Sequence, residues 1–345
     1  MLAILGAVIA AKQFVVRVPP GLRLSWTPRG LRPSRLPVAA EPLPDALAAA
    51  LPARQGSTTP VRQGRLTPAE RAAEEVEALR RRHLSPVDCV DRPVIPLASS
   101  ASAADLLPGL ERSLLTGIPG LARRRRRAAR EQAVQRATEE AERLAADARM
   151  RRVADQAACD AWWSRLADGD PAAVFSFCVE AFDRAGVSAA LVAVDGHDLT
   201  LVTTVPGLEA LPPRMPIRGS KGKATTRTML RGERAGLYTA LVCGHAVLTL
   251  REAFALLPFA STLRLVVLLD SGVGALGLRR LEPLLCVVSP RATFLRSVRP
   301  ESSAADTLRA GCRDVLQNVQ AGQLVPIPLD HQDGLKDLLH AIDRV

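Results

Sequence analysis

Forty-eight consecutive residues, Leu121–Asp168, contain neither glycine nor proline, and this stretch constrains the fold more than any other feature. Alanine, arginine, glutamate and glutamine dominate it, and all four favour helix. One continuous helix here would be ~70 Å long at about 1.5 Å per residue. Its apolar stripe is thin and mostly alanine, with Leu144, Met150 and Val153 among its larger members. The stretch therefore predicts a long helix without predicting a coiled coil.

Positive charge is concentrated outside the C-terminal part of the chain. The formal net charge is +11. Residues 1–120 carry 15 basic and 10 acidic groups, residues 121–152 carry 11 and 5, and residues 153–345 carry 20 and 20. This asymmetry indicates a basic arm that meets an anionic partner, such as nucleic acid or a membrane surface.

The densest charge is the run Arg123–Arg127, followed by Arg130. Five consecutive arginines on a helix point in all directions, so they cannot all be buried. Since no aromatic residue lies nearby to stack on bases, any nucleic acid is expected to bind through its phosphate backbone.

A second basic segment, residues 214–234, has seven cations against the single acid Glu233. Its Gly219–Thr225 part lacks the spacing of a phosphate-binding loop. Two interpretations stay open, a solvated loop and a phosphate-contacting loop. The predicted anion-contacting residues in the two segments are Arg123, Arg124, Arg125, Arg126, Arg127, Arg130, Arg218, Lys221, Lys223 and Arg227.

The chain divides into four predicted parts. Residues 1–35 form a small β-hairpin unit, 36–120 a linker with short helices, 121–168 the long basic helix and 169–345 a mixed α/β domain. In the first part, strands are expected at Phe14–Val18 and Leu22–Trp26, around Pro19-Pro20-Gly21. In the second, Thr67 to Glu70 has the pattern of a capping box and Ala103–Leu115 is a second helix. The apolar Met1–Ala11 is shorter than the ~20 residues that span a bilayer, so it is expected to pack on protein.

The C-terminal domain begins at Asp170-Pro171, where aspartate caps a helix that Gly186 ends. The pattern predicts helix, strand, strand, a third strand, helix, strand as its core order. After the first helix, the expected strands are Val187–Val194, Leu199–Val205, one within Ile217–Arg227, Leu263–Leu269, Leu284–Val288, Ala292–Val298 and Leu324–Pro328, and the expected helices are Glu233–Leu257, Ala304–Ala321 and Gly334–Ile342.

No complete catalytic motif is present in the sequence. Gly272–Gly277 matches the GxGxxG pattern, but Pro283 follows too soon for the helix that a dinucleotide site needs, so a loop between strands is expected. Cys243-Gly244-His245 offers two metal ligands within an apolar helix, where core packing explains both residues. We therefore expect neither a cofactor nor a metal site, and favour a binding protein over an enzyme.

Two alternatives stay open beside the binding hypothesis. The strand order resembles the core of restriction-endonuclease-like nucleases, and Glu180, Asp195 and Lys223 can be set against that pattern. However, Asp195 lies in a turn and the paired acid-x-Lys element is missing, which favours a degenerate, binding-only version over a metal-dependent phosphodiesterase. The other alternative is a scaffold in which the long helix mediates homo-oligomerisation.

The six cysteines are scattered and form no CxxC pair, which is typical of a reducing compartment. We therefore predict a cytoplasmic protein without stable membrane insertion.

Two segments carry a resemblance to a known family. The sequence from Pro20 to Gly30 resembles the N-terminal hairpin motif of an uncharacterised bacterial, actinobacterial-type family. Leu237 to Pro258, with Gly222-Lys223 upstream, resembles the long helix of that family's C-terminal domain. This chain departs from the family at Met1–Ala11, where a basic opening is typical. The resemblance implies the domain plan and no activity.

Overall fold

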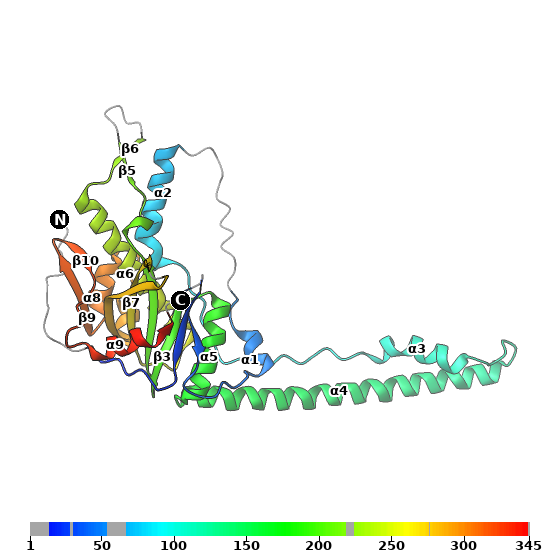
Figure 1. The fold of residues 1–345 in the computed structure, drawn as a ribbon. Helices are drawn as coiled ribbons and strands as arrows, with labels where there is room; N and C mark the ends of the chain where they lie inside the picture. Colours follow the sequence, from blue (N-terminus) through cyan, green and yellow to red (C-terminus); the bar gives the residue numbers. More distant parts are fainter. Residues whose placement is uncertain (1–13, 28–29, 54–66, 219–223, 276, 344–345) are drawn as a thin grey trace. The chain divides into compact units, whose positions relative to one another are not determined.

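The computed structural model describes residues 14–27, 30–53, 67–218, 224–275 and 277–343 (Figure 1). The protein is mixed α+β, with one long helix and several sheets, as the sequence predicts in outline. It divides into two compact units. The sheet unit comprises Met1–Leu43, Ala50–Asp91 and Arg165–Val345, and the arm unit comprises Pro44–Ala49 and Arg92–Ser164.

A six-stranded sheet in the order β10-β9-β8-β7-β4-β3 forms the centre of the sheet unit. Strands β4 and β7 are parallel, and the other neighbours are antiparallel. The middle strands are runs of valine and leucine with almost no exposure, which is typical of strands covered on both faces. The strands are β3 (Ala189–Asp195), β4 (Asp198–Pro206), β7 (Thr262–Val273), β8 (Arg279–Pro290), β9 (Asp314–Gln320) and β10 (Gln323–Val325).

Helix α6 (Arg231–Leu256) is the main core helix and packs along β4 and β7. By length and composition it could span a membrane, but 67% of its most apolar 18-residue stretch is buried inside the fold, as in a core helix. The other helices of this unit are α2 (Pro68–Arg81) with the 3-10 turn η1 (Arg82–Leu84), α5 (Pro171–Ala185), α7 (Arg291–Ser297), α8 (Ala304–Gly311) and α9 (Asp333–His340), and a second 3-10 turn, η2, spans Leu208–Ala210.

The sequence predicted several helix ends correctly. The capping box of α2 is present, because the Thr67 hydroxyl accepts from the Glu70 N–H and the Glu70 carboxylate accepts from the Thr67 N–H. Helix α5 begins at the predicted cap Asp170 and ends at Gly186, whose φ of +67° suits glycine. These ends are set by neighbours within four residues, so local sequence determines them.

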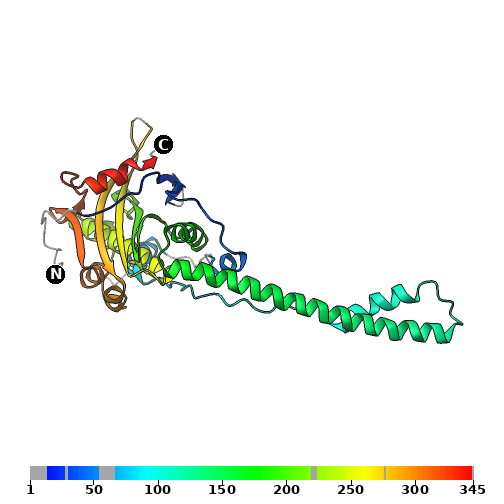
Figure 2. The same cartoon turned by 90° about the horizontal axis from the view of Figure 1, so that it is seen from below.

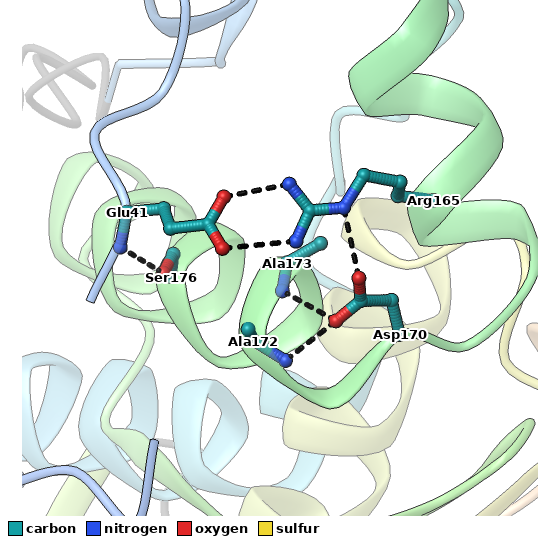
Figure 3. Close-up of polar contacts among 6 residues, drawn as sticks. All are labelled: Glu41, Arg165, Asp170, Ala172, Ala173 and Ser176. Carbon is teal, nitrogen blue, oxygen red and sulfur yellow. Dashed lines mark hydrogen bonds and ion pairs between the residues drawn. The ribbon is translucent and has the colours of Figure 1, made fainter. Parts of the chain in front are cut away.

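Arg165, near the end of the long helix, joins three segments of the sheet unit (Figure 3). Its Nη1 and Nη2 donate to the Glu41 carboxylate at 2.6 and 3.0 Å, and its Nε donates to Asp170 Oδ2 at 2.8 Å. The other Asp170 oxygen caps the first turn of α5. The Glu41 N–H donates to Ser176 Oγ on the same helix. Hydrogen bonding to Arg165 lowers the pKa of both carboxyls.

Buried polar contacts hold α6 to the sheet. Thr203 Oγ1 on β4 donates to Ser188 O at 2.6 Å and lies 2.8 Å from His245 Nε2 on α6. Because the Thr203 hydrogen points to Ser188, Nε2 is the donor in this pair. Burial, with a smaller contribution from Arg82, lowers the pKa of His245 to about 4. Cys243 is 1% exposed, so both residues belong to the core, as predicted.

The glycine-rich segment Gly272–Gly277 lies at the tip of the β7–β8 hairpin. Gly274 N donates to Leu278 O at 2.8 Å, and β8 follows directly. No helix follows the glycines that could present its N-terminus to a pyrophosphate, as the loop interpretation predicted.

Two predictions in the C-terminal half are wrong. Ala292–Val298, predicted as strand, is helix α7, because Pro290 ends β8 and Phe294 packs on Phe254 at 5.7 Å between ring centroids. Ala304–Ala321, predicted as one helix, is α8 to Gly311 followed by strand β9. Strand β9 pairs with β8, and this long-range pairing overrides local helix propensity.

The small N-terminal sheet differs from the predicted hairpin. Its order is β11-β1-β2, with β1 at Arg23–Thr27, β2 at Gly30–Arg35 and β11 at Ile342–Asp343. Phe14–Val18 is not a strand. Its first N–H donates instead to Gln332 Oε1, so a side chain takes the role of a ladder partner. The Met1–Ala11 prediction lies outside the described residues.

The single strand predicted within Ile217–Arg227 is two strands. Strands β5 (Arg214–Arg218) and β6 (Ala224–Thr228) pair with each other and form a separate two-stranded sheet. This sheet packs against α2.

The arm unit contains most of α1 (Asp45–Ala50), α3 (Ala103–Leu115) and the greater part of α4 (Arg123–Ala167). Helix α4 confirms the predicted long helix. Helix α3 lies beside the Arg123 end of α4 in both views (Figures 1 and 2). Further along α4, two hydrogen bonds connect the helix to Ile95, in the extended chain before α3. The Ile95 N–H donates to Gln156 Oε1, and the Ile95 carbonyl accepts from Arg152 Nε.

Candidate functional site

The arginine segment (Arg123–Arg127 and Arg130) occupies the first two turns of α4, and the first turn contains no acidic residue. The N-terminus of a helix carries a partial positive charge of its own. Side-chain and backbone charge therefore have the same sign here. A bound anion would relieve both repulsions, and a helix N-terminus with cationic side chains is a favourable environment for phosphate.

The buried face of this end of α4 is set by Ala129, Ala133 and Ala137, which are 8%, 0% and 1% exposed. At about 100° per residue, Arg124 and Arg127 fall on the opposite face, and Arg123 lies on the flank between the two faces. Arg126 lies nearer the buried face, and the structure shows it half-buried, with Nη1 donating to Ile118 O at 3.3 Å. The alanine stripe thus turns most of the arginine segment away from protein.

Few of these arginines have an acidic partner. Arg127 pairs with Glu131 at 3.0 Å, but both side chains are exposed, 84% and 65%, and such a pair contributes little. Arg123, Arg124, Arg125 and Arg130 are in no ion pair within the described part of the chain. The segment thus presents uncompensated positive charge.

In the second basic segment, residues 214–234, part of the positive charge is neutralised by an ion pair within the chain. Arg227 donates to both oxygens of Glu233, at 2.8 and 2.5 Å, and this hydrogen bonding lowers the pKa of Glu233 to about 2. The positive charge of Arg227 is therefore neutralised by Glu233 within the chain. For Arg218 the structure describes only its place in β5. Lys221 and Lys223 lie outside the described residues.

The residues set against the nuclease pattern form no metal site in the described chain. Glu180 pairs with Arg184 on its own helix at 2.5 Å, and Asp195 is exposed at the end of β3. Lys223 is not described. Among the residues with described positions, no group of three or more His, Cys, Asp or Glu could hold a metal ion.

A cleft of about 1130 Å³ in the sheet unit was missed by sequence reasoning. It lies among the end of α2, the start of α6, the start of α8 and the β9–β10 hairpin. Gly232, Gly236 and Ala240 all line it from α6. They recur every four residues and so share one helix face. This small-residue pattern is the sequence signal that could have predicted a hollow there.

Two residues of the cleft lining also carry polar atoms that are buried from solvent. His83 is 3% exposed, and its Nε2 lies 3.0 Å from Ser302 O. Its Nδ1 is buried with no hydrogen-bond partner in the described chain, and the same is true of Gln317 Oε1. Both residues line the cleft.

Comparisons with known proteins identify no relative. No protein-family model, curated protein or solved structure matches the chain. The resemblance to an uncharacterised bacterial family therefore stays a prediction.

Proposed function

We propose that this protein binds nucleic acid, or a similar polyanion, through the arginine segment of α4. The supporting observation is the set of four arginines, Arg123, Arg124, Arg125 and Arg130, that are in no ion pair within the described residues. The sequence places only one acidic residue, Glu131, next to the six arginines of this segment. We leave Arg227 out of the proposed contact surface, because Glu233 already neutralises it.

The chemistry favours contact with phosphates over contact with bases. Arginine forms charge-assisted, bidentate hydrogen bonds with phosphate oxygens. No aromatic residue lies between Leu121 and Ala161 to stack on a base. Affinity should therefore come from the release of counterions and depend little on nucleotide sequence.

The test is the salt dependence of binding to a 30-base-pair DNA duplex, with single-stranded RNA as a second probe. The variant replaces Arg123–Arg127 with glutamine. If about four of these residues contact phosphates, the magnitude of the slope of log K against log salt falls by roughly 3 to 4. A matched control replaces five exposed arginines of the sheet unit: Arg71, Arg280, Arg296, Arg299 and Arg313.

An unchanged slope in the Arg123–Arg127 variant, or an equal loss in the control, contradicts the proposal. Vesicles containing phosphatidylserine form a third arm. Binding to those vesicles without binding to either nucleic acid would assign the segment to a membrane surface instead.

The cysteines support a reducing compartment such as the cytoplasm, since all six are free thiols. The alternative of a nuclease-like fold is supported only by strand order. Strand β7 is parallel to β4 across α6, while β5 and β6 lie in another sheet in place of a third strand. The scaffold alternative is supported by Met150 and Val153, which are 67% and 69% exposed on α4. Light scattering that finds only monomer would contradict it.

A further inference from the structure

Four exposed arginines form two rows along the first turns of α4. Measured from the buried Ala133 at about 100° per residue, Arg123 and Arg130 lie roughly 60–80° to one side. Arg125 and Arg136 lie roughly 60–80° to the other side. All four are exposed, and none is in an ion pair within the described ranges. The helix therefore carries a line of uncompensated guanidinium groups on each flank.

Each row is long enough to meet several phosphates of one strand. At about 1.5 Å rise per residue, Arg123 and Arg130 are about 10 Å apart along the helix axis, and Arg125 and Arg136 about 16 Å. Phosphates of one DNA strand recur about every 3.4 Å along the duplex axis. Two rows on opposite flanks of one helix are therefore matched by two phosphate strands, one on each side.

A nucleic acid offers two strands in this way only in a groove that admits a helix. An α-helix with its side chains is about 10–12 Å across, and the major groove of B-form DNA is about 12 Å wide. The B-form minor groove, at about 6 Å, and the deep, narrow major groove of A-form RNA do not admit one. A single strand supplies one line of phosphates and is held by aromatic stacking, for which residues 121–161 offer no ring.

The outward face of α4, opposite Ala133, suits the floor of such a groove. Arg124, Ala128 and Gln135 lie on this face and are exposed. Ala128 is small, and the other two carry hydrogen-bond donors that base edges accept. Glu131 also lies on this face, where Arg127 pairs with it. No bulky side chain on this face keeps the helix out of the groove.

The acids that follow Arg136 set where the contact ends. Glu139, Glu140 and Glu142 come within the next six residues, and like charge repels the phosphates there. The span Arg123–Arg136 is about 21 Å long, which corresponds to roughly six base pairs. The charge pattern thus limits the contact to one stretch of groove.

We propose that the partner of the arm is duplex DNA in the B form, and that the span Arg123–Arg136 lies in its major groove. Arg123 and Arg130 contact one phosphate strand, and Arg125 and Arg136 contact the other. Arg136, which the sequence did not predict as a contact, joins the site. The inference rests on the nucleic-acid binding proposed for the arginine segment, and it names the form of nucleic acid that is bound.

The first test compares the full chain on a 30-base-pair DNA duplex, an RNA duplex of the same sequence and the two DNA single strands, all at one salt concentration. We expect the DNA duplex to bind about ten-fold or more tightly than the other three. Equal affinity for all of them overturns this inference and leaves nucleic-acid binding standing. Binding to none of them contradicts nucleic-acid binding itself, so the two failures are distinguishable.

The second test blocks one groove at constant phosphate charge. In one duplex, glucosylated 5-hydroxymethylcytosine fills the major groove, and in the matched control, N2-ethylguanine occupies the minor groove. The first duplex should bind about ten-fold more weakly than unmodified DNA, and the second should bind like unmodified DNA. An unchanged affinity for the glucosylated duplex overturns the placement in the major groove.

Two double variants test the two flanks separately. Arg123→Gln with Arg130→Gln, and Arg125→Gln with Arg136→Gln, should each lower the magnitude of the slope of log K against log salt by about 2. The control, Arg149→Gln with Arg151→Gln, removes two exposed arginines of the same helix beyond the acidic stretch and should leave the slope unchanged. A loss in only one flank variant, or an equal loss in the control, overturns the proposal.

Discussion

Acidification should destabilise the sheet unit through His245. Burial lowers the pKa of this ring from 6.5 to about 4, so the folded state favours the neutral form. The unfolded chain takes up a proton below pH 6.5, whereas the folded chain resists until about pH 4. The contribution of neutral His245 is therefore fully present above pH 6.5 and is lost as the pH falls toward 4.

The size of this loss follows from the two pKa values. Between pH 7.5 and pH 5, linkage gives a decrease of about 2 kcal/mol in the free energy of unfolding, with a limit of roughly 3 kcal/mol below pH 4. The carboxyls of Glu41 and Asp170, whose pKa values are lowered, lose their own contribution at more acidic pH. The pH range from 7.5 to 5 therefore separates the contribution of His245 from that of these two carboxyls.

Urea unfolding of the wild type and of His245→Gln at pH 7.5, 6.5, 5.75 and 5 measures the effect. Glutamine keeps an N–H donor for Thr203 Oγ1 and does not titrate, so it is the matched variant. The free energy of unfolding of the wild type should fall by about 2 kcal/mol more than that of the variant over this range. Parallel pH profiles for the two proteins would refute the reasoning.

The structure also predicts how three further substitutions change the stability of the protein to urea. Gly169→Ala should cost at least about 1–2 kcal/mol in urea unfolding, because its φ is +72° and a Cβ there would lie 2.6 Å from Gly196 O; an unchanged midpoint contradicts this. Phe294→Ala, at a fully buried side chain, should cost about 3–5 kcal/mol, whereas Leu295→Ala, at a side chain 48% exposed, should cost far less; equal losses would be inconsistent with the packing of α7. Arg165→Gln should lower the urea midpoint at pH 7, and this loss should shrink as the pH falls through the lowered pKa values of Glu41 and Asp170; a loss that does not change with pH argues against the ion pairs.

The candidate sites differ in how far sequence could predict them. The arginine run is a property of consecutive residues, so its charge and exposure follow from composition and helix geometry. Only the structure shows that Arg227 is neutralised, because the sequence does not determine whether a cation pairs with an acid six residues away. The cleft joins residues from 77 to 324, and its two unpartnered acceptors are recognisable only once their surroundings are known.

The sequence by itself determined the features that depend on near neighbours. These include the long helix α4, the capped start of α2, the Asp170 to Gly186 bounds of α5 and the glycine-rich hairpin tip. Each results from propensity or hydrogen bonding within a few residues.

Tertiary structure decided the identity of segments whose local preference is weak. Residues 314–320 are strand because β8 offers a free edge, and residues 291–297 are helix because Phe294 packs on Phe254. Tertiary structure likewise decided which charges of residues 214–234 are neutralised and placed the cleft among four distant elements. The free energy of these choices comes from pairing and burial between segments far apart in the chain, which no local window contains.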